Sequence, residues 1–568
     1  MHIDVVPNRG ARPAYLLRES YREGARVHKR TLANLSSLSD EQILAIRAVL
    51  RGEQLGLVAD RFEAIASRPH GHVQAVRVAM HRLGFEALLA ARPGRLRDLV
   101  SAMVAARVLA PHTKLATTRW WQSTTLAAEF GVAEATEDEL YAAMDWLLTR
   151  QAAIEKKLAG RHLRVGGRVL YDLSSSYFEG HCCPLARMGH NRDGKKNKLQ
   201  VNYGLVSAPG GCPVAVSVYP GNTADAQTLL PQVQRLREDF GIDTLVIVGD
   251  RGMISQKAID ELRGLEGVGW ITALKSAQIR LLVEQGNLQL GLFDQRNLVE
   301  LTHPDFPGER LVACRNPQLA ALRAHKRQEL LQATVAELAK VQAMVERKRL
   351  RGADQIGVRV GRVINQYKVA KHFELTIAAQ RFAFRIRDDE VAKEAALDGI
   401  YIVRTPVAAT IMDAPQVVRS YKSLSDVERA FRCLKTVDLK VRPIHHRLAD
   451  RVRSHIFLCM LAYYVEWHMR EAWRSLLFAD EDQLAKAQRD PVAPAARSAA
   501  AKHKALTHTL PDGTAAHSFR TLLDELSTIV RNTCRAPGAD SDTPTFEIVT
   551  TPTKKQKHAL ELLATIAT

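Results

Sequence analysis

The chain has 568 residues, too many for one hydrophobic core, and it predicts about three or four domains. Its 80 Lys and Arg residues outnumber 61 Asp and Glu residues, so the net charge of +19 favours a polyanionic partner, first of all nucleic acid. The longest apolar runs, such as 456–465, are shorter than the roughly 20 residues of a membrane-spanning helix, and the first residues do not resemble a signal peptide. We therefore expect a cytoplasmic, nucleoid-associated protein with no membrane partner.

The seven cysteines are odd in number and irregularly spaced, which argues against a disulfide framework. One segment, His181-Cys182-Cys183 with His190 nearby, contains metal-binding side chains, but its spacing matches no standard zinc module. Ordinary buried or surface thiols are the better interpretation of these residues.

Residues 1–40 predict a basic β-hairpin arm, because short strand-like runs are separated by turn signals. Contact with DNA and a solvated charged face are equally good interpretations of its basic residues. From Ser39, a favourable N-cap, the pattern becomes helical, and breaks are expected at 92–94 and 110–112. Residues 41–163 thus predict a helical region that binds DNA ends or mediates dimerisation.

Residues 164–285 predict the first part of an α/β core. A strand from Arg168 is expected to end at Asp172, beside a turn of three serines. Two more strands, at 199–207 and 213–219, suggest an antiparallel meander with the first. The apolar run 245–248 is typical of a strand buried on both faces, and Asp250 follows it.

Residues 286–405 predict an inserted α+β domain with strands and one long helix, an arm of about 45 Å. The apolar stripe of that helix repeats at spacings of three and four, at Leu331, Val335, Leu338, Val341 and Val345. The core is expected to resume at 406–478. Residues 479–568 predict a helical or disordered C-terminal tail, because their composition becomes low in complexity.

The segment from Tyr421 to Lys435 carries the most informative pattern. Its apolar residues recur at the spacing of one helix face, at Val427, Ala430, Phe431 and Leu434. Tyr421, Glu428 and Lys435 are seven residues apart, so they share one line along the helix beside that face. A carboxylate framed by a phenol and an ammonium group suits a site for a metal ion and a phosphate.

Three acids distant in sequence, Asp172, Asp250 and Glu428, could meet at one edge of the sheet. Clustered carboxylates need cations, and hard oxygen ligands favour Mg²⁺ or Mn²⁺. Two such ions about 3.5–4 Å apart would activate a water or a 3′-hydroxyl and stabilise a leaving oxygen. The simpler alternatives are that the two aspartates cap turns and that Ser425 and Glu428 form a helix capping box.

These residues resemble the DDE transposases of bacterial insertion sequences, in the insertion-sequence-four superfamily and most of all the insertion sequence 1634 branch. Tyr421, Leu424, Glu428 and Lys435 have the spacing of that superfamily's tyrosine, arginine, glutamate and lysine signature. Further motifs occur in the same order: Tyr171-Asp172-Leu173-Ser174, Gly221-Asn222-Thr223, Gly249-Asp250-Arg251-Gly252-Met253 and Arg442-Pro443-Ile444 before His446.

The resemblance implies an α/β fold with a ribonuclease H-like core, interrupted by the insertion and preceded by a mostly helical region. It also implies that Asp172, Asp250 and Glu428 are the catalytic, metal-binding triad, and that Tyr421, Lys435 and Arg442 contact DNA. Leu424 stands where the signature has arginine, so that contact is not carried over. Arg432, one turn beyond Glu428, could reach a phosphate instead.

The function that follows is Mg²⁺-dependent cleavage and strand transfer by two metal ions. The expected partners are double-stranded DNA, as terminal inverted repeats and target, and a second copy of the chain, as a homodimer in the synaptic complex. A ribonuclease H-like nuclease without strand transfer is the second enzymatic hypothesis. A DNA-binding transposase remnant without activity is the third, and the presence of all three acids counts against it.

Overall fold

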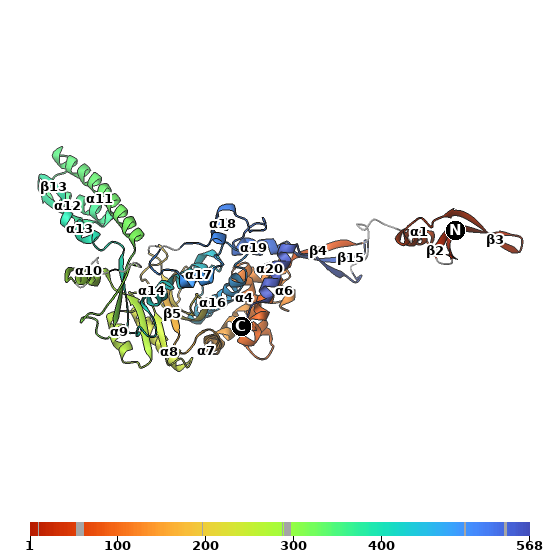
Figure 1. Ribbon diagram of the computed structural model, residues 1–568, viewed down its shortest axis with the longest axis horizontal. Helices are drawn as coiled ribbons and strands as arrows, with labels where there is room; N and C mark the ends of the chain where they lie inside the picture. Colours follow the sequence, from red (N-terminus) through yellow and green to blue (C-terminus); the bar gives the residue numbers. More distant parts are fainter. Residues whose placement is uncertain are drawn as a thin grey trace. The chain divides into compact units, whose positions relative to one another are not determined.

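The computed structural model describes residues 1–567 except 9–10, 53–61, 196, 287, 289–292, 294–296, 494–495 and 539–541. The described chain divides into two compact units. One comprises Met1–Pro69 with Ile529–Thr551, and the other His70–Thr528 with Pro552–Thr568. Figure 1 colours the chain along its sequence, so the contributions to each unit can be followed. Among the described helices, none has both the length and the apolar character needed to cross a bilayer.

The first unit begins with a three-stranded antiparallel sheet rather than the single hairpin expected for 1–40. Its strands are β1 (His2–Asn8), β2 (Ala11–Glu23) and β3 (Arg26–Asn34). Several basic side chains are ion-paired inside this sheet: Arg18 and Lys29 contact Asp4 at 2.9 and 3.0 Å, and Arg30 contacts Glu19 at 3.0 Å. Part of the positive charge is therefore already compensated within the arm.

Helix α1 (Asp40–Leu50) follows, and Ser39 caps it as predicted. The Ser39 hydroxyl accepts from the Gln42 backbone N–H at 3.2 Å, and the Gln42 side chain accepts from the Ser39 N–H at 2.9 Å. The predicted helical region 41–163 also contains a strand, β4 (Glu63–Pro69), which pairs with β15 (Val530–Arg535). β16 (Phe546–Val549) completes this second small sheet on the other side of β15.

The second unit begins with helices separated at the two predicted breaks. They are α2 (Gly71–Arg82), α3 (Phe85–Leu89), α4 (Arg95–Leu109), α5 (Lys114–Trp120), η2 (Trp121–Ser123), α6 (Leu126–Glu129) and α7 (Glu137–His162). Thr136 starts α7 with a capping box to Glu139. These helices pack around α16 (Ala449–Ala472), which contacts both α4 and α7. Every residue of α16 from Ser454 to Glu466 is buried, so this helix forms the centre of the helical layer.

An eight-stranded mixed sheet carries the rest of the second unit, in the order β10-β11-β14-β9-β8-β5-β6-β7. β5, β6 and β7 form the predicted antiparallel meander, and β8 and β9 run parallel to β5. The strand bounds are β5 (Arg168–Tyr177), β6 (Gln200–Ser207), β7 (Pro213–Pro220), β8 (Leu245–Val248), β9 (Val268–Ala273), β10 (Leu298–Leu301), β11 (Arg310–Arg315) and β14 (Ile400–Thr405). The helices between them are α8 (Ala226–Glu238), α9 (Gln256–Arg263) and α10 (Ser276–Glu284).

Strand β5 is longer than the sequence suggested. Asp172 lies inside it and does not end it, because the three serines continue the strand and pair with β6. The Ser176 hydroxyl lies 2.8 Å from the Tyr203 hydroxyl, so a polar residue is accommodated in the buried strand by a side-chain hydrogen bond. The expected serine turn is therefore wrong.

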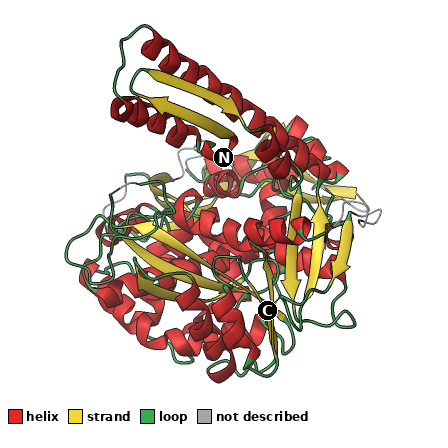
Figure 2. Cartoon of the chain, turned by 90° about the vertical axis from the view of Figure 1, so that its left-hand side faces the viewer, coloured by secondary structure: helices red, strands yellow, loops and turns green. Residues whose placement is uncertain are grey.

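The insertion is smaller than the range 286–405 proposed for it, because β10, β11 and β14 belong to the eight-stranded sheet. Part of its start, at 287, 289–292 and 294–296, lies outside the described residues. The separate part contains α11 (Pro317–Glu346), α12 (Ala353–Tyr367), η4 (Ala370–His372), β12 (Phe373–Ala378), β13 (Arg381–Ile386) and α13 (Asp388–Ala395). It has a hydrophobic cluster of its own, including Leu338, Ile356 and Phe382. Figure 2 shows its two strands lying along its helices.

The chain returns to the sheet through α14 (Ala414–Lys422) and α15 (Leu424–Arg432), followed by a π-helical turn, η5 (Cys433–Val437). The predicted single helix from Tyr421 to Lys435 is thus divided at Ser423 and again at Cys433. Ser423 keeps helical backbone angles and donates its N–H to Arg419 and Ser420. The helical path continues, but its faces are no longer those of one straight helix.

The C-terminal residues are more ordered than the predicted tail. They form α17 (Gln483–Gln488), α18 (Ala499–Thr507), α19 (Phe519–Ser527) and α20 (Lys554–Ala564) besides β15 and β16. Both α19 and α20 pack against α2, and the Trp473 indole N–H donates to the Ala559 carbonyl at 2.8 Å. These helices are ordered because they pack against segments far away in the sequence, and the local composition does not indicate such contacts. Residues 494–495 and 539–541, where a linker and disorder were expected, lie outside the described residues.

Candidate active site

Two of the three predicted acids are neighbours through the register of the central strands. In the parallel pairing of β5 with β8, Leu170 lies opposite Val248. Asp172 and Asp250 each follow two residues later, so they lie side by side at the same level of the sheet. Because side chains two residues apart share a face, the register favours both carboxyls on one side.

Each aspartate uses one carboxylate oxygen locally. Asp172 Oδ1 accepts from the Leu173 backbone N–H at 2.8 Å. Asp250 Oδ1 accepts from the N–H groups of Gly252 and Met253 at 3.0 and 2.8 Å, which closes the turn after β8. The interpretation that Asp250 caps a turn is therefore correct for its Oδ1 atom. In each aspartate the second oxygen, Oδ2, has no hydrogen bond within the described part of the chain.

Glu428 is brought to the sheet by the apolar face of α15. Val427 and Ala430 are fully buried, and the Phe431 ring meets the Tyr203 ring of β6 edge-on at 5.8 Å. α15 also contacts β5, the strand of Asp172. Burying a side chain such as Phe431 contributes about 1.5–3 kcal/mol, so this face fixes the helix orientation. Glu428 lies next to the buried face and is exposed.

The capping-box alternative for Glu428 fails in this structure. The N-cap of α15 is Ser423, two residues before Ser425, and the helix start has no side-chain cap hydrogen bond. Glu428 makes neither a hydrogen bond nor an ion pair with any described residue. Its carboxylate is therefore free for another partner.

The electrostatics of Asp172 show that the three acids converge. The pKa of Asp172 is raised to about 7, and burial is the largest cause. The negative charges of Asp250 and Glu428 contribute to the rise, while the Leu173 hydrogen bond and Arg192 oppose it. Since such effects fall with distance, both acids lie within electrostatic reach of Asp172.

The donor set fits divalent cations that prefer oxygen. None of the three acids has an ion-pair partner among the described residues, and Arg192 acts on Asp172 only through its charge. Their oxygens do not all lie within 4.8 Å of one another. One ion bound by all three acids at once is thus disfavoured in this geometry.

Tyr421 and Arg432 flank this cluster along the helical path. Tyr421 is half-buried; burial raises its pKa, and the nearby Asp250 and Glu428 charges add to the rise. Arg432 is exposed at the last position of α15, and its guanidinium has no ion pair in the described structure. Leu424, at the arginine position of the signature, is buried and has no polar atom to offer.

Lys435 and Arg442 meet at a residue that sequence reasoning missed. Both cations contact Oδ1 of Asp193, Lys435 at 2.9 Å. The Asp193 side chain is 2% exposed, and its Oδ2 accepts from the Tyr177 backbone N–H at 3.0 Å. Burial lowers the pKa of Lys435, and Asp193 opposes that change. Of the three residues predicted to share one line, Tyr421, Glu428 and Lys435, the last is thus engaged in an ion pair within the protein.

Asp193 gave no signal of this role in the sequence. It stands in Asn191-Arg192-Asp193-Gly194, which has the composition of an ordinary turn. Its neighbour Arg192 forms a two-oxygen ion pair with Asp225 and also lowers the pKa of Asp172. The loop between β5 and β6 therefore contacts the site region through two residues. Asp193 binds Lys435 and Arg442, and Arg192 lies within electrostatic reach of Asp172. Lys196, also in this loop, lies outside the described residues.

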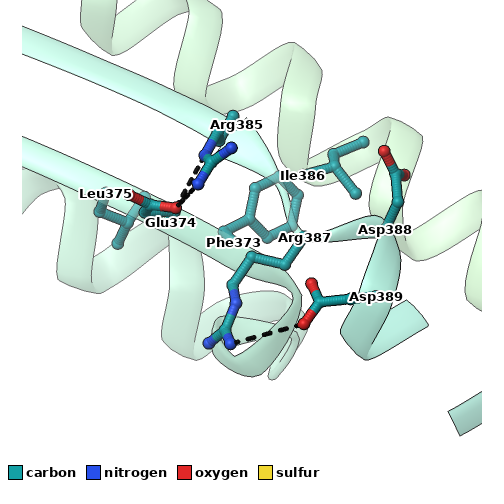
Figure 3. A pocket seen from close by; sticks show the side chains of 8 residues that line it. All are labelled: Phe373, Glu374, Leu375, Arg385, Ile386, Arg387, Asp388 and Asp389. Atoms are coloured by element: carbon teal, nitrogen blue, oxygen red, sulfur yellow. Dashed lines mark hydrogen bonds and ion pairs between the residues drawn. The ribbon is translucent and has the colours of Figure 1, made fainter. Parts of the chain in front are cut away.

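A pocket of the described structure lies elsewhere. It has a volume of about 680 Å³ and belongs to the insertion, where Phe373, Glu374, Arg385, Arg387 and Asp389 are among its lining residues. Figure 3 shows that Glu374 pairs with Arg385 and Arg387 with Asp389, whereas Asp388 has no such contact with the residues drawn. The three acids line neither this pocket nor the next one described.

Fold and site together define an α/β protein with three converging, unpaired carboxyl groups at the edge of a mixed sheet. The family model described as "Transposase DDE domain" matches residues 182–465, half of the chain. The chain belongs to this family and is a DDE-type transposase. A second model, "IS1634 family transposase, N-terminal domain", matches residues 3–58 and assigns it to that branch. The DDE match includes Asp250 and Glu428 but begins after Asp172.

Comparison with curated proteins gives no significant match. Among solved structures, seven chains match. One is similar to this chain at 9% identity and a TM-score of 0.33, over 80% of this chain and 76% of that chain. It is described as "Cryo-EM structure of piggyBac transposase synaptic complex with hairpin DNA (SNHP)". A TM-score this low supports no conclusion about the present fold.

Proposed function

We propose that this transposase binds the ends of its own insertion sequence, cleaves the DNA there and joins the released ends to target DNA. Asp172, Asp250 and Glu428 are the proposed catalytic residues. The observation that carries the proposal is their convergence from β5, the turn after β8 and α15, with no cationic partner for any of them among the described residues.

The proposed core is ribonuclease H-like. Its support is the order and direction of five strands, β7-β6-β5-β8-β9, in which the antiparallel meander is followed by two strands parallel to β5. The insertion after the second aspartate and before the glutamate agrees with the family resemblance. Because a fold alone does not define an activity, the proposal rests on the acids and the family membership.

Asp172, Asp250 and Glu428 would hold two Mg²⁺ ions, with Mn²⁺ as an alternative, through carboxylate oxygens that make no hydrogen bond in the described structure. Bound ions of this kind supply Lewis-acid activation of the attacking oxygen and stabilisation of the leaving oxygen. The protein contributes position: the turn after β8 fixes Asp250, and the buried face of α15 fixes Glu428.

DNA contacts are proposed on both sides of the triad. Tyr421 and the exposed Arg432 are positioned by the helices beside Glu428. Lys435 and Arg442 also carry positive charge, but both are ion-paired with Asp193. We propose that they attract DNA mainly through their electrostatic potential and less through direct contacts with phosphates. Double-stranded DNA is the proposed partner, and a homodimer is the proposed form in the synaptic complex.

The decisive experiment uses labelled DNA that carries both ends of the element, with an unlabelled target and Mg²⁺. We expect cleaved and joined products from the wild type. Glu428→Gln should bind the DNA but yield no products. Glu261→Gln, an exposed glutamate on α9, is the matched control and should behave as the wild type.

The alternatives give different results. Cleaved DNA without joined products would favour the nuclease, and binding without cleavage in the wild type would favour the inactive remnant. Cleavage by Glu428→Gln at the wild-type rate would remove Glu428 from the mechanism. A rise in melting temperature with Mg²⁺, present in the wild type and absent in Asp172→Asn, tests metal binding without reference to activity.

A further inference from the structure

Three side chains of types that commonly bind metals lie close together where α7, α16 and β7 pack against one another, separate from the three acids. They are His162, the last residue of α7, Cys212, directly before β7, and His468 on α16. Each offers a ligand atom, and no two of these atoms are more than 4.8 Å apart. Cys212 and His468 are buried, and His162 is half-buried. The three elements also contact one another in pairs, so the cluster lies within one packed region.

The spacing is close to that of a metal centre. The Cys212 Sγ atom lies 3.9 Å from the His468 Nε2 atom. In a tetrahedral zinc site, Zn–S near 2.3 Å and Zn–N near 2.0 Å place such atoms about 3.5 Å apart. For this pair a shift of a few tenths of an ångström would therefore be enough, and the ligand atom of His162 lies within 4.8 Å of both. The alternative is a weak S–H···N contact within a group of packed rings.

The surroundings resemble those of metal-binding histidines. The His162 Nε2 atom lies 3.0 Å from the Tyr464 hydroxyl, a partner of the kind that orients a ligating imidazole.

We propose that His162, Cys212 and His468 bind a zinc ion as its three protein ligands, with solvent at the fourth position. Binding would convert the Cys212 thiol to a thiolate and release its proton to water, with no change in oxidation state. Nitrogen and thiolate ligands select zinc over magnesium, so this site is chemically separate from the oxygen-only site of the acids.

The site has a structural consequence near the catalytic helix. Cys212 ends the turn between β6 and β7, and the Trp467 indole N–H donates to the Gly210 carbonyl of that turn at 3.1 Å. A Cβ at Gly211, whose φ is +85°, would lie 3.1 Å from Asp426. Asp426 is two residues before Glu428 on α15. A zinc ion that links this turn to α7 and α16 would therefore restrict the motion of the turn against which α15 packs.

Two other groups in the same region provide contrasts. Cys433, Asp438 and Glu466 also lie close together, but the Arg470 guanidinium contacts both acids, at 2.7 and 2.6 Å, so a cation of the protein already lies at this group. Cys459 lies 4.0 Å from His455 on α16, a similar pair for which the described residues offer no third ligand close enough to complete a group. Cys459→Ser is therefore a matched control for Cys212→Ser.

The test is the zinc content of the full-length chain. The protein is stripped with a chelator, given one equivalent of Zn²⁺ in the presence of excess Mg²⁺, desalted and measured by mass spectrometry. We expect about one zinc per wild-type chain and per Cys459→Ser chain. Cys212→Ser and His468→Asn should lose most of it. Because a thiol proton is released, affinity should rise about tenfold per pH unit below the thiol pKa.

Cobalt gives a readout that requires no variant. Co²⁺ added to the stripped wild type should produce the thiolate-to-cobalt charge-transfer band and the strong visible bands of tetrahedral coordination, and Zn²⁺ should bleach them. Absence of zinc and of the cobalt spectrum in folded wild type overturns the proposal. Equal zinc retention by Cys212→Ser, with wild-type circular dichroism, also overturns it. Neither result depends on DNA cleavage, so the proposed transposition activity stands or falls separately.

Discussion

Asp172 and Asp250 lie side by side because Leu170 of β5 is opposite Val248 of β8, and each aspartate follows two residues later. The parallel register, rather than a loop, determines their proximity. The two carboxyls differ in their local bonds, since Asp250 closes a turn with two backbone N–H groups and Asp172 accepts one. Substitutions of Asp250 can therefore distinguish its role in the turn from its proposed role in catalysis.

Asp250→Asn and Asp250→Ala should therefore diverge in stability but not in activity. Both should lower DNA cleavage by roughly 10³-fold or more, since neither side chain replaces the carboxylate. Asparagine retains an oxygen for the turn, so its free energy of unfolding should stay within about 0.5 kcal/mol of the wild type, whereas alanine should lose about 1–2 kcal/mol. Urea unfolding and a cleavage assay measure the two quantities. Cleavage by Asp250→Asn at more than a tenth of the wild-type rate would contradict the assignment.

Arg432 should contact a DNA phosphate in place of the arginine that Leu424 replaces. Arg432→Ala should reduce the slope of log affinity against log salt by about one, because one phosphate contact is lost. Arg429, on the same helix and exposed, is ion-paired with Asp426 at 3.8 Å and serves as the control. Titrations of labelled end DNA at several salt concentrations give the slopes. Equal slopes for the two alanine variants would argue against the contact.

Asp193 should be essential for the stability of the active-site edge. Asp193→Ala leaves Lys435 and Arg442 without their shared counter-ion and removes the acceptor of the Tyr177 N–H. We expect a loss of about 3–5 kcal/mol in the free energy of unfolding, as for one partner of a buried ion pair. Glu179→Ala, which removes an exposed ion pair to Lys198, should cost less than about 1 kcal/mol. Similar losses in denaturant unfolding of both variants would refute this role.

Lys114 predicts a stability change with pH. It is 5% exposed and has no ion-pair partner among the described residues, and burial, with Arg107 as a smaller cause, lowers its pKa to about 7. Because the unfolded pKa is near 10.4, the cost of charging Lys114 is complete below about pH 7 and disappears as the pH approaches 10.4. Lys114→Met should thus stabilise the protein by roughly 1–3 kcal/mol at pH 6, and the gain should vanish near pH 10.

Lys504 is the control for that experiment. It is 1% exposed, but it bonds Glu481 at 2.7 Å and the Arg474 carbonyl at 3.2 Å. Lys504→Met should therefore destabilise the protein at pH 6, by about 1–2 kcal/mol. Chemical unfolding from pH 6 to 9.5 gives both curves. A Lys114→Met gain that does not shrink with rising pH would mean that the effect is packing and not charge.

Local sequence patterns were sufficient for most elements near the site. The apolar run 245–248 predicts the buried strand β8, and the apolar spacing around Val427 and Phe431 predicts helix α15. Spacing cannot show where a helix changes its geometry, as it does at Ser423, between Tyr421 and Glu428, and in the π-turn that starts at Cys433, between Glu428 and Lys435. Nor can it show that serines continue a strand when a partner strand satisfies them, as in β5.

By itself the sequence determined the acids, their order and their family, because those depend on residue identity and spacing along the chain. The neighbouring positions of Asp172 and Asp250, the capture of Lys435 and Arg442 by Asp193, and the meeting of His162, Cys212 and His468 were decided only by the tertiary structure. The physical reason is that register and burial set these contacts. Both are determined by packing between segments far apart in the chain, and a local pattern does not record them.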